Sequence, residues 1–193
     1  QKASRTVKNY YSKYDEYNLN INNIMDLNEK YNNIIKFYFI PIKTCNKDQN
    51  INFHLPKFKK ILREINEREH EIGIHPGYKS YDNDKLFKNS ADSFFSILSE
   101  LNIKQNIYGG RQHFLRWDFS KTPILWENNG FDYDSSLSYA DISGFRCGTC
   151  TEFNMYDFIN KKQLKVKEIP LINMECSIIS QSYEGLGYTQ KAL

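Results

Sequence analysis

Histidine and arginine residues gather in two stretches whose spacing suits metal-assisted or acid–base chemistry. His75 ends the stretch HEIGIH and precedes Pro76, and the stretch GGRQHFLRW holds Arg111 and His113. Because proline disfavours helix at the residue before it, the chain should stop at His75 and present its imidazole. In an extended chain Arg111 and His113 point to the same side. An imidazole can ligate a metal or shuttle protons, and a guanidinium can bind an oxyanion.

Carboxylates form a second group of candidates. In FDYDSS, Asp132 and Asp134 lie on one side of an extended chain, and paired carboxylates can serve acid–base or metal chemistry. Aspartates near a turn also serve as simple caps. Glu175 is expected within the last strand, where a buried carboxylate needs a partner such as Arg111 or Arg146.

Several of these residues also have a plain structural interpretation. His70 lies at the opposite end of the short strand from His75, so a structural role is favoured for it. His75 itself could be a loop histidine bonded to backbone, and GGRQHFLRW could be a surface strand. Cys147 and Cys150 form one CxxC, whereas a closed zinc site usually needs a second pair, so ordinary thiols are favoured over a zinc or redox module.

Helical and strand-like segments alternate along the chain. Such an order predicts an α/β fold, either a parallel sheet or a (β/α) barrel. In both, functional residues gather at the carboxyl ends of the strands, where His75, Arg111 and His113 are expected. Thr122 is expected as the cap of a short helix that ends at Gly130. The other expected elements are helices over 21–31, 58–67 and 94–101, and strands within 34–42, 71–74, 107–117 and 167–179.

Length and charge limit the classes of function. With 193 residues the chain is expected to form a single domain over 1–193. A net charge of +3 without a basic patch argues against nucleic-acid binding. The sequence contains no apolar stretch of the roughly 18 residues that a membrane span needs, and no signal peptide. The location expected for the chain is cytoplasmic, but this does not follow from the missing signal peptide, since the true N-terminus is expected to lie outside the chain. Gln1 and the closing TQKAL, which resembles a helix just begun, suggest a piece of a longer protein.

Five motifs in a fixed order carry a family resemblance. They are HEIGIHPGYKSY, GGRQHFLRWDF, TPILWENNGFDYDSSLSYAD, GFRCGTCTEF and PLINMECS. Together they resemble a divergent bacterial branch of the polysaccharide deacetylase family, the NodB-homology domain of carbohydrate esterase family 4, over about residues 18 to 185. The resemblance implies a distorted (β/α) barrel of about seven strands. It also implies a divalent metal, usually zinc, held by one aspartate and two histidines, whose bound water attacks an acetyl carbonyl.

The resemblance assigns residues only in part. His75 matches the first metal histidine, and Arg111 matches an arginine that orients the catalytic aspartate. The second metal histidine is replaced by Lys79, which is a poor zinc ligand at neutral pH. We therefore hypothesise that His113 completes the metal site from the neighbouring strand. Asp134 is carried forward as the candidate catalytic carboxylate.

Two of the family's motifs lie outside the five. A Thr-Phe-Asp-Asp-like strand with the base and the metal aspartate should precede Ile21, but residues 1–20 contain only Asp15, without an apolar strand around it. A Leu-x-His-like motif with the acid should follow Leu193. The isolated 193-residue chain is therefore expected to show little deacetylase activity and weak metal affinity.

The sequence favours removal of N- or O-acetyl groups from a carbohydrate by metal-dependent hydrolysis. The alternative is a non-catalytic carbohydrate-binding relative with the same barrel, which Lys79 supports, so whether the chain is an enzyme stays open. In either case exposed aromatic rings, Tyr81 among them, would stack on sugar. The expected partner is a carbohydrate, and its candidate binding residues are Tyr78, Ser80, Arg116, Trp117 and Tyr139.

Overall fold

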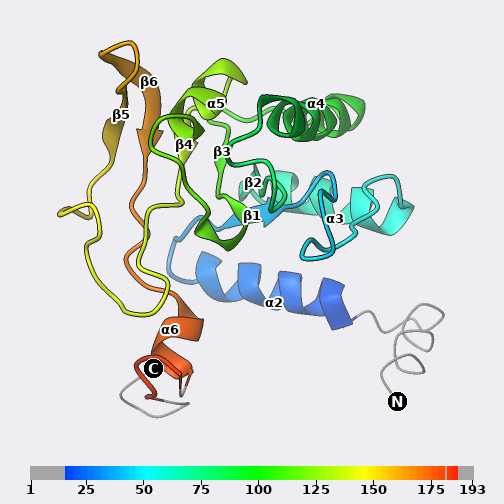
Figure 1. The fold of residues 1–193 in the computed structure, drawn as a ribbon. Helices are drawn as coiled ribbons and strands as arrows, with labels where there is room; N and C mark the ends of the chain where they lie inside the picture. The colour runs from blue at the N-terminus through cyan, green and yellow to red at the C-terminus, as the bar shows by residue number, and fades with distance from the viewer. Residues whose placement is uncertain (1–15, 181, 187–193) are drawn as a thin grey trace. The chain divides into compact units, whose positions relative to one another are not determined.

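The computed structural model describes residues 16–180 and 182–186, and it has an α/β fold (Figure 1). These residues belong to two compact units. Of the described residues, unit 1 comprises 16–37 and 54–72, and unit 2 comprises 38–53, 73–180 and 182–186. Each unit is described by itself. Asp15 and the closing TQKAL lie outside the described residues.

Unit 1 contains helix α2 (Glu16–Glu29), helix α3 (Pro56–Glu67) and the first halves of strands β1 (Lys36–Phe39) and β2 (Glu71–Ile74). The helix expected over 58–67 is confirmed as α3, and its apolar residues Ile61, Leu62 and Ile65 are buried on one face. Proline occupies the first turn of α3, where its missing N–H costs nothing. In α2 the apolar stripe is narrower than the spacing suggests: Met25 is fully buried, but Ile24 is exposed.

Arg68 and His70 connect the end of α3 to α2 by polar contacts. Arg68 Nε donates to Glu29 Oε1 at 2.7 Å, and its Nη2 donates to Asp26 Oδ1 at 2.5 Å. His70 is buried, accepts a hydrogen bond at Nδ1 from Ile35 N at 3.3 Å, and places Nε2 3.3 Å from Glu29 Oε1. His70 therefore has the structural role that its position in the sequence favours.

Unit 2 carries the remaining strands: β3 (Gly109–Gly110), β4 (Tyr133–Asp134), β5 (Phe153–Asp157) and β6 (Lys162–Glu168). The sheet order is β1-β2-β3-β4-β6-β5. The pairs β2–β3, β3–β4 and β4–β6 are parallel, and β5–β6 is antiparallel. The described residues thus form an open six-stranded sheet within an α/β fold, and the distorted barrel of about seven strands, expected to be incomplete in this chain, stays a prediction.

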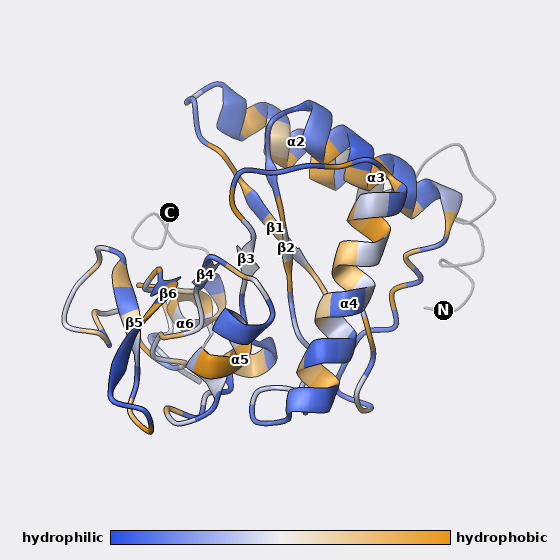
Figure 2. Cartoon of the chain, turned by 90° about the horizontal axis from the view of Figure 1, so that it is seen from above, coloured by the Kyte–Doolittle hydropathy of each residue, from blue (hydrophilic) through white to orange (hydrophobic). Residues whose placement is uncertain are grey.

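The helices of unit 2 are α4 (Asp84–Glu100), α5 (Thr122–Asn128) and α6 (Glu175–Ile179), with a 3-10 turn η1 at His113–Leu115. Helices α4 and α5 lie side by side (Figure 1), and α4 alternates between hydrophobic and hydrophilic bands (Figure 2). Aromatic rings from both helices pack against Phe131. The ring centroid of Phe131 lies 5.0 Å from that of Trp126 and 5.1 Å from that of Phe95.

The pair Gly109–Gly110 sets how closely β3 approaches its neighbours. A Cβ added at Gly110 would overlap the carbonyl oxygen of Ile74, and one added at Gly109 would overlap the ring of Tyr133. Only glycine fits at either position. At Gly110 the missing side chain thus lets the backbone of β2 approach closely.

One predicted strand is short and another is wrong in extent. The segment 107–117, expected to hold a strand and its exit loop, contains the two-residue β3 and then turns into η1 at His113. The segment 167–179 is not one strand: β6 ends at Glu168, Pro170 has no N–H for a ladder, and residues 175–179 form α6. Glu175 is therefore exposed at the start of a helix and needs no buried partner.

Other boundaries differ by less. Lys121, not Thr122, is the residue that caps α5, because Thr122 already has helical geometry and its hydroxyl is used elsewhere. The end of α5 is as predicted, with Gly130 in the left-handed region at φ 76°. Strand β5 was not expected at all. No helix of the described residues has the length and apolar character to cross a membrane.

Replacement of Gly110 by alanine should lower the free energy of unfolding by about 3 kcal/mol, because the new methyl group overlaps the Ile74 carbonyl. Urea unfolding followed by circular dichroism measures this. Gly130→Asn is the matched control, since a Cβ there meets no atom and asparagine tolerates positive φ. Equal loss of stability in both variants would contradict the close-approach argument.

Candidate functional site

The candidate site lies in unit 2, where the chain leaves β1, β2, β3 and β4. The register aligns Ile74, Gly110 and Asp134 across neighbouring strands. The residue after each of these remains tied to the sheet: Arg111 N donates to Ile74 O at 3.0 Å, and Ser135 N donates to Gly110 O at 2.9 Å. The carboxyl ends of the strands therefore present their following side chains along one edge.

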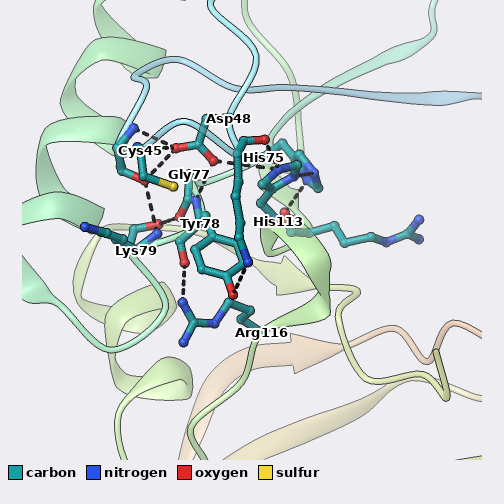
Figure 3. Close-up of polar contacts among 12 residues, drawn as sticks. Cys45, Asp48, His75, Gly77, Tyr78, Lys79, His113 and Arg116 are labelled. Atoms are coloured by element: carbon teal, nitrogen blue, oxygen red, sulfur yellow. Dashed lines mark hydrogen bonds and ion pairs between the residues drawn. The ribbon is translucent and has the colours of Figure 1, made fainter.

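His75 and His113 meet at this edge (Figure 3). His113 Nδ1 lies 2.9 Å from His75 Nε2, and the rings are nearly perpendicular, at 83°. His113 reaches this position because η1 folds back over β2, with His113 N donating to Pro76 O at 3.3 Å. The structure thus brings together the two histidines that the sequence proposed as metal ligands.

The hydrogen bonds assign the tautomer of His75. Its Nδ1 lies 2.7 Å from the carbonyl oxygen of Arg111, which can only accept, so Nδ1 carries the proton. His75 Nε2 is then the acceptor, and His113 Nδ1 is the donor. The far nitrogen of His113, Nε2, lies 3.2 Å from Lys47 O and 3.7 Å from Asp48 Oδ1. A proton on that nitrogen would meet a carbonyl and a carboxylate.

Burial controls the charge of His75. Desolvation and, to a smaller extent, the charge of His113 together lower the pKa of His75 to about 4, against the opposing effect of the hydrogen bond that His75 Nδ1 donates to the Arg111 carbonyl. His75 is therefore neutral at pH 7, with a lone pair on Nε2 directed at its partner.

Asp48 was missed by the sequence analysis. It is buried in the loop after β1, where Oδ2 accepts from Thr44 N and Thr44 Oγ1, both at 2.6 Å, and Oδ1 accepts from Tyr78 N at 2.8 Å. Burial by itself would raise the pKa of Asp48, but these hydrogen bonds outweigh it and hold the pKa below the usual value. The strand-end rule applied to β1 would have drawn attention to this loop.

The residues present do not by themselves fit a metal ion. Catalytic zinc sites take three protein ligands. Within the described part of the chain, no group of three His, Cys, Asp or Glu side chains is arranged to hold a metal. The lone pair of His75 Nε2 already accepts a hydrogen bond from His113, and Asp48 already accepts from Thr44, Cys45 and Tyr78. A zinc ion at His75 and His113 stays a prediction.

Arg111 does not face the histidine pair as the extended-chain argument expected. Its guanidinium crosses to the end of β4, where Nε donates to Ser135 O at 2.8 Å and Nη2 donates to Ser135 Oγ at 2.9 Å. The side chains of Arg111 and His113 diverge because the backbone turns into η1 between them. Arg111 contacts His75 through its backbone carbonyl oxygen, which accepts from His75 Nδ1.

Asp134 pairs with Glu168, its register partner on β6. Both are fully buried. Asp134 Oδ1 accepts from Ser136 Oγ at 2.6 Å, and Glu168 Oε1 accepts from Leu137 N at 2.9 Å. Burial raises the pKa of both carboxyls, and the charge of Asp134 raises that of Glu168 further.

One shared proton would satisfy this carboxyl pair. Glu168 Oε2 is buried and meets no donor among the described residues, and the side chains of Glu168 and Asp134 interact with each other. Asp134 thus has no exposed surface with which to touch a ligand, and its catalytic role stays a prediction. Asp132 is exposed and accepts from Tyr108 N at 2.8 Å, as in the capping alternative.

Tyr78 is the centre of a group of aromatic and basic side chains beside the histidine pair. The guanidinium carbon of Arg116 lies 4.2 Å from the Tyr78 ring centroid and 3.9 Å from that of Tyr81, so Arg116 contacts two tyrosine rings. Lys47 Nζ lies 4.2 Å from the Tyr78 centroid and donates to its hydroxyl at 3.0 Å, which lowers the pKa of Tyr78. Phe114 contacts Tyr78 edge-on at 5.4 Å.

The other residues predicted to bind carbohydrate are placed differently. Ser80 is fully buried, and its hydroxyl donates to Gly77 O at 2.5 Å, so it shapes the turn after His75. Trp117 is half-buried and Tyr139 is 39% exposed. The structure therefore joins only Tyr78 and Arg116 of the predicted binding residues to the histidine pair.

Comparison of the sequence with family models and with curated proteins gives no match. Among solved structures, the chain is similar to one described as a "putative polysaccharide deacetylase" from Mycobacterium smegmatis. The TM-score is 0.52 at 18% sequence identity, over 78% of this chain and 45% of that chain. The chain thus shares an α/β fold with this protein and spans less than half of its length.

Stability should depend on pH through His75. The unfolded imidazole takes a proton near pH 6.5, whereas the folded one resists until about pH 4, so the stabilisation is complete above pH 6.5 and is lost as the pH falls toward 4. Between these pH values, wild type should lose up to about 3 kcal/mol more than His75→Gln in urea unfolding. The same pH dependence in both proteins would contradict a neutral buried His75.

The carboxyl pair should give the opposite dependence. The unfolded carboxyl of Glu168 loses its proton near its usual pKa, while the folded one keeps it, so wild type becomes less stable as the pH rises above that value. Glu168→Gln should therefore raise the free energy of unfolding at pH 8 by about 1–2 kcal/mol, and by less at pH 4. Glu175→Gln, at an exposed position, is the control; a loss of stability at pH 8 in Glu168→Gln alone would contradict the shared proton.

Proposed function

We propose that this protein acts on acetylated carbohydrate and removes N- or O-acetyl groups by hydrolysis at the His75–His113 pair. The observation that carries the proposal is this pair, in hydrogen-bond contact where the chain leaves β2 and β3. The likeness in fold to a protein described as a polysaccharide deacetylase supports it, as do the five motifs of the sequence.

In this proposal the imidazole pair moves a proton. The pair takes a proton from an attacking water molecule and returns it to the leaving nitrogen or oxygen. The Arg111 carbonyl holds His75 in one tautomer, and His113 Nδ1 is the donor to His75 Nε2, so the nitrogen of the pair that can take the proton is His113 Nε2, 3.7 Å from Asp48 Oδ1. Zinc binding, which the resemblance implies, is kept as a separate prediction with its own measurement.

A second candidate function is carbohydrate binding without catalysis. Lys79, in the place of the family's second metal histidine, favours it. Its side chain is exposed, and its backbone N–H donates to Thr44 Oγ1 at 3.0 Å, so Lys79 is part of the turn and does not replace the missing ligand. The aromatic and basic group around Tyr78 serves binding under either function.

Acetate release from acetylated chito-oligosaccharides and acetylated xylan, measured on the longer protein of which this chain is expected to be a piece, tests the two functions. Release by wild type should fall about 100-fold in His113→Gln, because general acid–base groups contribute factors of that size. His54→Gln changes an exposed histidine that is not part of the pair, and this variant should release acetate as wild type does. Glycan binding without acetate release, with or without added zinc, would contradict hydrolysis and support the binding function.

Elemental analysis of the same proteins addresses the metal. If His113 is a ligand, bound zinc per chain should fall in His113→Gln and not in His54→Gln. Unchanged zinc content in His113→Gln would exclude His113 as a ligand, while leaving the acetate measurement to decide the proton-transfer role.

A further inference from the structure

We propose that the carbohydrate recognised at this site is acidic, and that Arg116 and Lys47 bind its anionic substituent. The inference rests on the proposed function and deepens it by naming the substrate class. The cation–aromatic group consists of Lys47, Tyr78, Tyr81, Phe114 and Arg116. The shared ligand chemistry is a sugar that carries a carboxylate, sulfate or phosphate.

The Arg116 side chain is held in place by its neighbours and keeps N–H groups that make no hydrogen bond within the described residues. Its guanidinium carbon lies within 4.2 Å of the centroids of Tyr78 and Tyr81, and Nη1 donates to Tyr78 O at 3.0 Å (Figure 3). Among the described residues, Nε and Nη2 have no hydrogen-bond partner, and no carboxylate pairs with the side chain. A planar guanidinium with free N–H groups suits a carboxylate or a phosphate, and little side-chain freedom remains to be lost on binding.

Lys47 places a second cation against the same ring. Its Nζ lies 4.2 Å from the Tyr78 centroid, and the side chain is exposed. The described part of the chain provides no carboxylate partner for Lys47 either. Two like charges in contact with one ring repel each other, and an anion bound between or beside them removes that repulsion.

The nearby carboxylates do not neutralise these cations. The Asp48 side chain is fully buried and accepts from Thr44, Cys45 and Tyr78. Asp118, two residues after Arg116, accepts from Ser120 N at 2.8 Å and Ser120 Oγ at 2.6 Å. Both carboxylates are directed at local donors, so the surface beside Tyr78 remains positive.

Phe114 connects the cations to the histidine pair. Its ring centroid lies 5.4 Å from that of Tyr78 and 4.7 Å from that of His113, and the residue is 64% exposed. Its backbone has a φ of 59°, a strained value for a bulky residue. A sugar ring stacked on Phe114 would have its acidic group toward Arg116 and its acetyl group toward His113.

Calorimetric titration with three families of oligosaccharide tests the proposal. The probes are galacturonate oligomers for carboxylate, sulfated and phosphorylated malto-oligosaccharides for the other anions, and unmodified malto-oligosaccharides as the neutral reference. At least one acidic family should bind about 10-fold more tightly than the neutral one, and the difference should shrink at high salt. The arm that binds most tightly identifies the anion.

Variants connect this preference to the cation–aromatic group. Arg116→Gln and Lys47→Gln should each lose about 10-fold in affinity for the acidic sugar and little for the neutral one, as expected for a charge-assisted hydrogen bond. Arg116→Lys should recover only part of the loss, since lysine lacks the planar fork. Lys104→Gln, at an exposed lysine elsewhere in unit 2, is the charge-matched control.

Phe114→Gly separates binding from stability. Glycine accepts the left-handed φ without strain, so the free energy of unfolding should stay or rise while sugar affinity falls. Equal binding of acidic and neutral sugars, or an equal effect of Lys104→Gln and Arg116→Gln, would overturn the inference. Acidic binding without acetate release would instead contradict the proposed hydrolysis alone, and acetate release without acidic preference would contradict this inference alone.

Discussion

The close approach of β3 to β2 is the constraint on which the site depends. Gly110 places its backbone where any side chain would overlap the Ile74 carbonyl, and this brings Arg111 N into hydrogen-bond contact with Ile74 O. Since Arg111 then offers its carbonyl to His75, the strand spacing also fixes the imidazole. The tautomer of His75 thus depends on the glycine at position 110 of the neighbouring strand.

The same edge of the sheet satisfies its buried polar groups in two ways. At β2 and β3, two imidazoles share a hydrogen bond, and one of them is kept neutral by burial. At β4 and β6, two carboxyls are packed so tightly that burial raises the pKa of both. The histidine pair lies beside the exposed ring of Phe114, whereas Asp134 and Glu168 are fully buried. The first therefore suits chemistry, and the second holds two parallel strands in register.

Local signals in the sequence were enough for part of this architecture. Pro76 after an apolar tetrapeptide placed His75 at a strand end, and the stripe of α3 was evident from its spacing. Asp48 was not found, because its role arises from four contacts made by loop folding, and nothing in its neighbours signals burial. The composition of residues 167–179 predicted one strand, whereas β6 ends at Glu168, shortly before Pro170. The side chains of Arg111 and His113 diverge because the chain turns into η1 at His113.

Thr122 connects two loops of the cation–aromatic group. Its buried hydroxyl donates to Tyr81 O at 2.7 Å and accepts from Asp118 N at 2.8 Å, so one oxygen fixes the loop that bears Tyr81 to the loop that bears Arg116. The backbone at Tyr81 and the backbone two residues after Arg116 are thereby held to one buried side chain. A ligand that binds Arg116 therefore needs to order little further backbone.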